Sequence, residues 1–190
     1  MSVINTFTRE LTLAILHDHE KWLDGKGGRR ADLSGADLRG VDLRGVDLSE
    51  AYLYGANLTG AKLHGADLHG ADLTWANLTN ADLTGADLTG ANLYVANLHG
   101  AKLDGTDLSD AKLFVANLCG TNLSGADLTK ANLEGANLSD AYLHGAKLTG
   151  AKLTGARLNR TYLHGADLTN ADLSGADLSK AKNVPDFSEL

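Results

Sequence analysis

Side chains that could do chemistry recur in this chain at intervals of twenty residues. Two histidines, His144 and His164, and two tyrosines, Tyr142 and Tyr162, follow this spacing. A row of carboxylates follows it too, here named the aspartate row: Asp47, Asp67, Asp87, Asp107 and Asp127. Two histidines without a third ligand make a poor metal site. We therefore expect no metal, no cofactor and no catalytic residue in the chain.

The aspartate row has three interpretations. Stacked like charges repel only weakly in water, so the row can be a plain solvated face whose carboxylates have mildly raised pKa values. It can instead offer negative charge to a basic partner, as a mimic of the phosphates of DNA would. Weak cation binding is the third possibility.

Apolar side chains gather on another part of the same twenty-residue register. We name this set the aromatic stripe: Tyr52, Tyr54, Trp75, Tyr94, Val95, Phe114 and Val115. Such a row can stabilise a sheet through contacts between neighbouring strands. An exposed apolar stripe more often marks an interface, however. The sequence therefore predicts a contact site for a protein partner or for a second copy of the chain.

A leucine at every fifth position, thirty times from Leu33 to Leu178, must position all these residues. With the leucine called i, position i−2 is always small, and position i−1 is Asp thirteen times and Asn eight times. Position i+2 is Gly nineteen times. Gly, Asn and Asp are turn-forming residues. The pattern therefore predicts a chain that turns within each five residues and directs the leucine and the small residue inward.

Helices and flat strands do not fit this period. Five residues rotate a helix by about 500°, so the leucines would share no face. An odd period also conflicts with the two-residue alternation of a strand. A solenoid of stacked coils remains, with a coil spacing of about 4.8 Å. Because the tyrosine, histidine and valine pairs recur every twenty residues, we predict four repeats per coil and about 7.5 coils.

Four repeats per coil give the solenoid four faces. Faces one, two, three and four hold the repeats centred on Leu33, Leu38, Leu43 and Leu48, respectively, and on every twentieth residue after each. The aromatic stripe lies on face one and the aspartate row on face four. Face two carries a column of asparagines, read as structural, and Cys119, read as inert. Face three alternates acidic and basic side chains, which indicates charge compensation.

Repeats such as Ala31-Asp32-Leu33-Ser34-Gly35 and Ala66-Asp67-Leu68-His69-Gly70 resemble those of the pentapeptide-repeat family. The resemblance covers residues 31–182. It implies an all-β fold, a right-handed quadrilateral β-helix. Some bacterial members of this family protect DNA gyrase from quinolones or toxins by imitating duplex DNA. The chain departs from that subgroup because no phenylalanine occupies position i and no loop interrupts the coils.

The two ends of the chain lack the repeat. Residues 1–30 read as a helix over about Thr6–Asp24 and a linker, with Phe7, Leu11, Ile15, Leu16, Trp22 and Leu23 on or beside its apolar face. This helix is expected to cap the solenoid. Residues 183–190 are expected to close the other end through Val184, Pro185 and Phe187.

Composition excludes several functions. The net charge of −7 argues against direct nucleic-acid binding. We find neither an apolar run long enough to span a membrane nor a signal peptide, and the single cysteine fits the reducing cytoplasm. No nucleophile–base pair or phosphate loop indicates an enzyme. We therefore expect a non-catalytic scaffold for protein–protein contact or self-association. The alternatives are a gyrase-binding DNA mimic and a purely structural rod.

Overall fold

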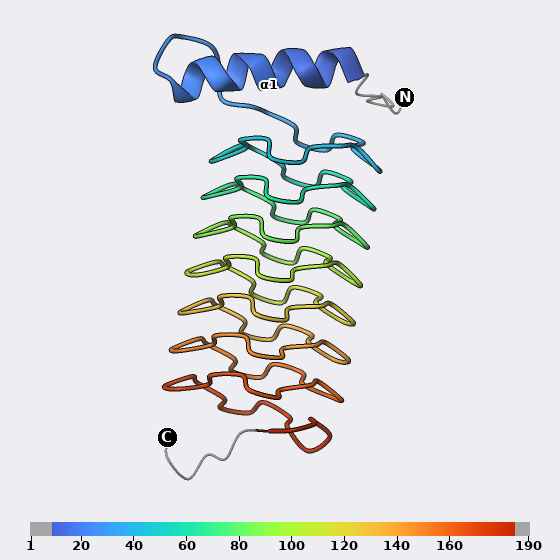
Figure 1. The fold of residues 1–190 in the computed structure, drawn as a ribbon, viewed down its shortest axis with the longest axis vertical. Coiled ribbons are helices and arrows are strands. Elements are labelled where there is room, and N and C mark those ends of the chain that lie inside the picture. Colours follow the sequence, from blue (N-terminus) through green and yellow to red (C-terminus); the bar gives the residue numbers. More distant parts are fainter. Residues whose placement is uncertain (1–8, 185–190) are drawn as a thin grey trace.

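The repeats wind into a parallel solenoid in the computed structural model, which describes residues 9–184. Its coils stack into a rod, with the one described helix at the N-terminal end (Figure 1). Parallel bridges join residues twenty apart along the whole rod, from Asp32–Tyr52 to Tyr162–Lys182. Each bridge is a single residue pair rather than part of a longer strand. This spacing agrees with four repeats per coil.

Each pentapeptide contains one tight turn. The amide of residue i+3 donates to the carbonyl of the leucine, as from Ala36 to Leu33 at 3.0 Å. Residue i+2 has a positive φ, such as 65° at Gly35. This combination is that of a type II turn, whose second central residue must be left-handed. Glycine adopts that conformation without strain, which explains its frequency at i+2.

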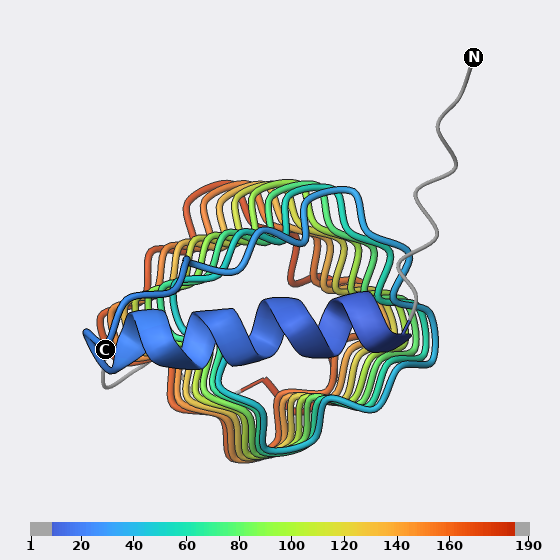
Figure 2. The ribbon, with the colours of Figure 1, turned by 90° about the horizontal axis from the view of Figure 1, so that it is seen from above.

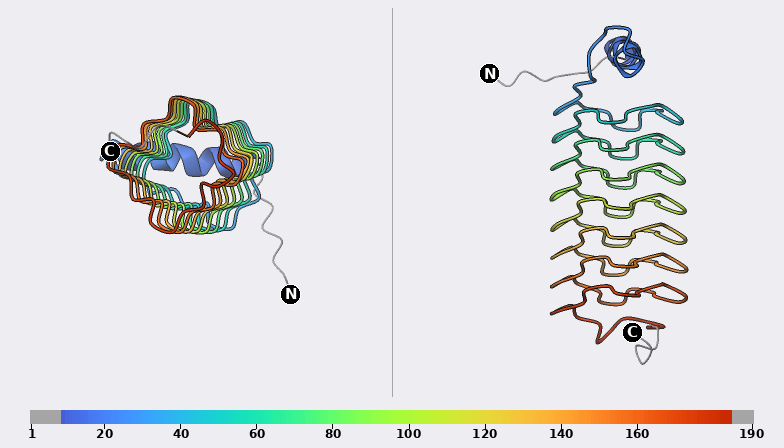
Figure 3. Two further views of the ribbon diagram at one scale, coloured as in Figure 1. Left: turned by 90° about the horizontal axis from the view of Figure 1, so that it is seen from below. Right: turned by 90° about the vertical axis from the view of Figure 1, so that its left-hand side faces the viewer.

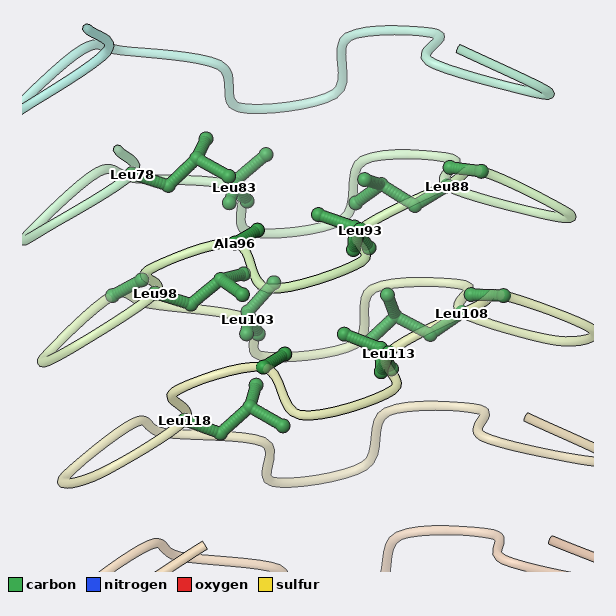
Figure 4. Close-up of a cluster of buried hydrophobic side chains, with 14 of the residues drawn as sticks. Leu78, Leu83, Leu88, Leu93, Ala96, Leu98, Leu103, Leu108, Leu113 and Leu118 are labelled. Atoms are coloured by element: carbon green, nitrogen blue, oxygen red, sulfur yellow. The ribbon is translucent and has the colours of Figure 1, made fainter. Parts of the chain in front are cut away.

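Leucine and alanine fill the interior of the rod. Leucines from Leu33 to Leu168 are at most 4% exposed, and alanines at i−2 lie between them (Figure 4). Thr106, Thr121 and Thr161 are also fully buried at i−2. Their hydroxyls donate to the carbonyls of Leu83, Leu118 and Leu138 at 2.7–2.8 Å. Because every buried polar group in this set has a partner, threonine substitutes for alanine without an unpaired hydroxyl.

Viewed along its axis, the solenoid has four sides, and equivalent residues of successive coils lie nearly one above another (Figure 2). Hydrogen bonds between coils are of three kinds. The i+2 amide donates to the i+1 carbonyl of the next coil, as from Gly35 to Tyr54 at 2.8 Å. The leucine amide donates to the i−1 carbonyl of the next coil, and that residue's amide donates back to the i−2 carbonyl. Side chains at i−1, i+1 and i+2 therefore form columns on each face.

Helix α1, Arg9–Leu23, lies across the N-terminal end of the solenoid (Figures 2 and 3). Ile15 and Leu16 pack against the leucine core. The linker then passes close beneath α1, and its Arg29 amide donates to the Asp18 carbonyl at 3.2 Å. Gly28 permits this approach, because a Cβ there would lie 2.2 Å from the Asp18 oxygen.

The buried side of α1 is more polar than the sequence suggested. His19 is completely buried, and Thr12 is 5% exposed. Leu23, expected on or beside the apolar face, is 36% exposed. The side chain of Leu11 and all of Phe7 lie outside the part of the chain described here.

His19 fastens α1 to the first coil. Its Nδ1 accepts a hydrogen bond from the Ala31 amide at 3.1 Å, and its ring stacks on Trp22 with centroids 5.6 Å apart. Burial lowers the pKa of His19 below its usual 6.5, and the nearby Arg30 acts in the same direction. The carboxylates of Asp47 and Glu50 and the Ser49 carbonyl partly oppose this shift.

At the other end, Val184 is half-buried and packs against the core. The expected contacts of Pro185 and Phe187 lie outside residues 9–184. Within the described part of the chain, no helix has the length and apolar character required to cross a membrane.

Docking of α1 should weaken in acid. Because the pKa of His19 is lower in the folded protein, its contribution is complete above about pH 6.5 and is lost as the pH falls through the folded value. We expect hydrogen exchange of α1 amides to accelerate from about pH 7.5 to about pH 5, beyond the intrinsic pH effect, while the coils stay protected.

His19→Gln is the matched control, since glutamine retains an acceptor for the Ala31 amide but does not titrate. Its α1 protection should depend far less on pH. The same acid-dependent loss in both proteins would show that His19 is not the responsible group.

Candidate functional site

The aromatic stripe forms one surface on face one. The rings of Tyr94 and Phe114 stack in parallel with centroids 5.7 Å apart. Tyr54 is 53% exposed, Trp75 is 56% exposed and Val115 is 45% exposed. The predicted residues therefore lie side by side on adjacent coils, and much of their apolar surface faces solvent.

Three residues of the aromatic stripe occupy a strained backbone position. Trp75, Val95 and Val115 stand at i+2 with φ values of 61°, 55° and 56°. The left-handed conformation costs a bulky or β-branched residue about 1–3 kcal/mol, whereas glycine adopts it freely. The amide of Trp75 donates to Tyr94 and that of Val95 to Phe114, so the turns themselves are regular. Seven polar residues at i+2 on faces two and four share this conformation: Glu50, Asn80, Asp110, Lys130, Asp140, Arg160 and Asn170. Face one differs because its residues in this conformation are apolar and bulky or β-branched.

Tyr52, at the N-terminal end of the stripe, already has a partner inside the protein. The Arg30 guanidinium lies 4.0 Å from the centre of the Tyr52 ring and donates to its hydroxyl at 3.1 Å. The same group lies 5.8 Å from the Trp22 ring and donates to the Glu50 carbonyl. Tyr52 therefore joins α1 and the linker to the first coils.

The aspartate row stacks as expected. Bridges connect Asp47, Asp67, Asp87, Asp107 and Asp127 in order, and Lys147 follows. Each of these carboxylates also accepts a hydrogen bond from the backbone amide two residues later, as in Asp107 to Ser109 at 2.9 Å. The Lys147 ammonium donates to Asp127 at 3.1 Å.

The same local bond occurs at every aspartate and every asparagine of position i−1. All thirteen aspartates and all eight asparagines accept the i+1 amide through Oδ1, as in Asp32 to Ser34 at 3.1 Å and Asn57 to Thr59 at 3.2 Å. This is an Asx turn, which satisfies an amide that the solenoid leaves unpaired. Each carboxylate of the aspartate row therefore stabilises its own turn.

The expected rise in carboxylate pKa does not occur where a shift is resolved. Burial alone would raise the pKa of Asp127, but hydrogen bonds from Thr129 and Lys147 hold it below its usual value. The Thr169 hydroxyl and amide likewise lower the pKa of Asp167. On face three, the Arg44 guanidinium lowers the pKa of Asp42 to about 2. Hydrogen-bond donors outweigh burial at these carboxylates.

Ion pairing on face three is more local than expected. Asp42 pairs with Arg44 of its own repeat at 2.7 Å, and Asp82 pairs with Lys102 of the next coil at 3.6 Å. The charges on face three therefore alternate in the sequence, but its ion pairs do not follow that alternation throughout.

Two other columns match the expected stacking. The ring centroids of Tyr142 and Tyr162 are 4.8 Å apart, and those of His144 and His164 are 5.0 Å apart. Among the described residues, no group of three potential ligands could hold a metal ion.

Face two carries the asparagine column. Asn117 donates to Asn97 at 3.0 Å, and Asn137 donates to Asn117 at 3.3 Å. Cys119 is half-buried and has a free thiol. The amide ladder thus links consecutive coils in addition to the Asx turns.

Sequence reasoning missed two contributors, His19 and the Asx turns. His19 gave no local signal, because its burial depends on where α1 meets the first coil. The Asx turns did have one, since Asp or Asn stands two residues before a turn amide in twenty-one of thirty repeats.

Replacing Asp107 separates its charge from its hydrogen bond. Asp107→Ala leaves the Ser109 amide and hydroxyl without an acceptor and should lower the free energy of unfolding by about 1 kcal/mol. Asp107→Asn keeps the acceptor and removes one charge from the row, so its stability should equal or exceed that of the original protein. Urea unfolding measures both; an Asn variant as unstable as the Ala variant would contradict the structural role.

Comparison with known proteins agrees with this geometry. The family model for pentapeptide repeats matches residues 31–70, 71–110, 111–150 and 146–182. No curated protein matches the chain. Among solved structures, HetL, a pentapeptide-repeat protein involved in heterocyst differentiation regulation in the cyanobacterium Nostoc sp. strain PCC 7120, is 38% identical, with a TM-score of 0.50. The match covers 80% of this chain and 78% of HetL.

A second similar structure is QnrB1, a plasmid-mediated fluoroquinolone resistance protein. It is 22% identical with a TM-score of 0.52, and the match covers 80% of this chain and 82% of QnrB1. At this identity the likeness concerns the fold alone. The family match implies a right-handed β-helix, and the repeats and turns fit that fold; the chain belongs to the pentapeptide-repeat family.

Proposed function

We propose that this protein is a non-catalytic scaffold that binds another protein, or a second copy of itself, through the aromatic stripe. The observation that carries the proposal is the column formed by Trp75, Val95 and Val115. These side chains are held in a conformation that glycine would adopt without strain. Trp75 and Val115 nevertheless remain about half exposed, so internal packing uses only part of their apolar surface.

The composition of the stripe also supports a contact surface. Tyrosine and tryptophan are enriched at interfaces, because they bury a large area and lose little conformational entropy. Tyr94 is already held in place by its stack on Phe114, which reduces the entropy lost on binding. HetL is involved in the regulation of differentiation, and a regulatory role by contact with other proteins fits a scaffold.

Removing the stripe tests this function. Tyr54→Ser, Trp75→Ser, Tyr94→Ser and Phe114→Ser combined should abolish self-association in sedimentation or light-scattering measurements, or abolish binding to a partner. The fold should persist, because these side chains lie outside the leucine core. Circular dichroism of the solenoid checks that point.

The double variant Tyr142→Ser and Tyr162→Ser is the matched control, because it removes a stacked aromatic pair from face three. It should leave association unchanged. Equal association of the stripe variant and the original protein would overturn the proposal. A monomer that binds no partner would favour the purely structural rod.

A gyrase-binding DNA mimic acting through the aspartate row is the weaker alternative. An oxygen of every carboxylate in the row already accepts a turn amide, and Lys147 neutralises the end of the row at Asp127. A gyrase supercoiling assay with a quinolone present distinguishes the two functions. No effect of the protein on gyrase or on its inhibition would remove the alternative.

A further inference from the structure

Charge is distributed unevenly along the rod. Residues 31–142 contain fifteen acidic and six basic residues, whereas residues 143–182 contain three acidic and six basic ones. The C-terminal coils are therefore positively charged, although the whole chain carries a net charge of −7. A local positive region on an acidic protein attracts anions to that place alone.

A hollow of about 350 Å³ opens on face two, where the acidic coils meet this basic region. It lies across four successive coils. Its lining residues are Cys119, Asn137, Ser139, Asp140, Arg157, Asn159, Arg160 and Lys180. Three cationic side chains and one carboxylate line the hollow, and Asp177 of the next coil is paired with Arg157 by a backbone bridge. Counted together, these residues carry one excess positive charge. Elsewhere on face two the i−1 column consists mainly of neutral asparagines.

One of the three cations is fixed by that carboxylate. Arg160 donates to both oxygens of Asp140, through Nε at 2.7 Å and through a terminal nitrogen at 2.6 Å. Its backbone amide also donates to the Lys180 carbonyl at 3.1 Å, which sets Lys180 directly after Arg160 in the i+2 column. Arg157 and Lys180 are exposed, and neither side chain forms an ion pair with a described residue. Two cations are therefore available to an incoming anion.

The backbone supplies a further donor at the same place. In repeats with Asp or Asn at i−1, an oxygen of that side chain accepts the i+1 amide. Arg157 occupies i−1 in this repeat, and a guanidinium cannot accept a hydrogen bond. No described residue accepts the Asn159 amide. The repeat therefore presents a cation and a free amide where the preceding and following coils of face two, at Asn137 and Asp177, present an acceptor with the amide already bound.

The rest of the fold shows what kind of atom this amide binds. At thirteen other turns the equivalent amide donates a hydrogen bond to an anionic carboxylate oxygen, at distances such as 3.0 Å from Ser179 to Asp177. Charge-assisted hydrogen bonds of this type are stronger than neutral ones. Ser139, in the preceding coil, adds a hydroxyl oxygen that has no hydrogen-bond partner in the structure.

We propose that this hollow binds a phosphate group. One phosphate oxygen takes the place of the missing side-chain acceptor and receives the Asn159 amide, while Arg157 and Lys180 bind the remaining oxygens. Arginine suits this role because its planar donors match the geometry of phosphate. The site is separate from the aromatic stripe, which lies on face one, so it adds a ligand to the proposed scaffold.

Isothermal titration calorimetry of the full-length protein with inorganic phosphate at low ionic strength tests the site. Arg157→Asn is the informative variant, because it extends the asparagine column and supplies the Asn159 amide with its own acceptor. It should weaken phosphate binding at least about tenfold. Its solenoid should be as stable as the original or more so, which excludes misfolding as the cause of the loss.

A second test variant, Arg157→Gln with Lys180→Gln, removes both available cations of the hollow. Its control for charge is the double variant Lys62→Gln and Lys152→Gln. Both remove two exposed positive charges, but Lys62 and Lys152 lie outside the hollow. Phosphate binding should persist in the control and be lost in the test variant. Equal losses in both, or no phosphate binding by the original protein, would overturn the proposal.

Comparing inorganic phosphate with O-phosphoserine under the same conditions identifies the source of the phosphate group. Tighter binding of the free ion supports a site for inorganic phosphate, and tighter binding of the monoester supports a site for a phosphorylated molecule. In either case Arg157→Asn must remove the binding, and retention of binding by this variant would contradict the assigned donors.

Discussion

The left-handed residue at i+2 is the constraint on which the rest of this solenoid depends. It closes a tight turn once in every five residues and thereby directs the leucine inward from each side of the rod. Glycine meets the constraint without strain, so most repeats leave i+2 without a side chain. Where a larger residue stands there, the fold accepts a local cost. That cost makes the column of Trp75, Val95 and Val115 informative, since core formation does not require these side chains.

The predictable part of the structure is the part that the period determines. Leucine spacing excluded helix and flat strand, and pairs such as Tyr142 with Tyr162 indicated twenty residues per coil, in agreement with the bridges. The twenty-residue spacing also predicted which side chains form columns on each face. The buried His19 and the Arg30 contact with Tyr52 did not, because both depend on how a non-repeating helix meets the first coil. The repeat pattern carries no information about the contact between α1 and the first coil.

The surface chemistry was predictable in position but not in role. The aspartate row lies where expected, yet one oxygen of each carboxylate is bound to a turn amide. Charge counting treats a carboxylate as a point on the surface and overlooks the amide two residues away. The same omission concealed the hollow around Arg157, which is recognisable only once the usual acceptor at i−1 is known to be missing. In this fold, the residues that depart from the repeat carry the information about function.

Stacking of equivalent residues every twenty positions has a consequence for how such a protein can evolve. Insertion or deletion of a whole coil lengthens or shortens the rod but keeps every later side chain on its original face. Insertion or deletion of a single pentapeptide preserves the leucine core equally well, yet it turns all later residues by a quarter of the circumference. The aromatic stripe would then be divided between two neighbouring faces. Duplication of one coil in the gene thus preserves the arrangement of side chains on the faces. A change of one pentapeptide rearranges the surface without disturbing the interior.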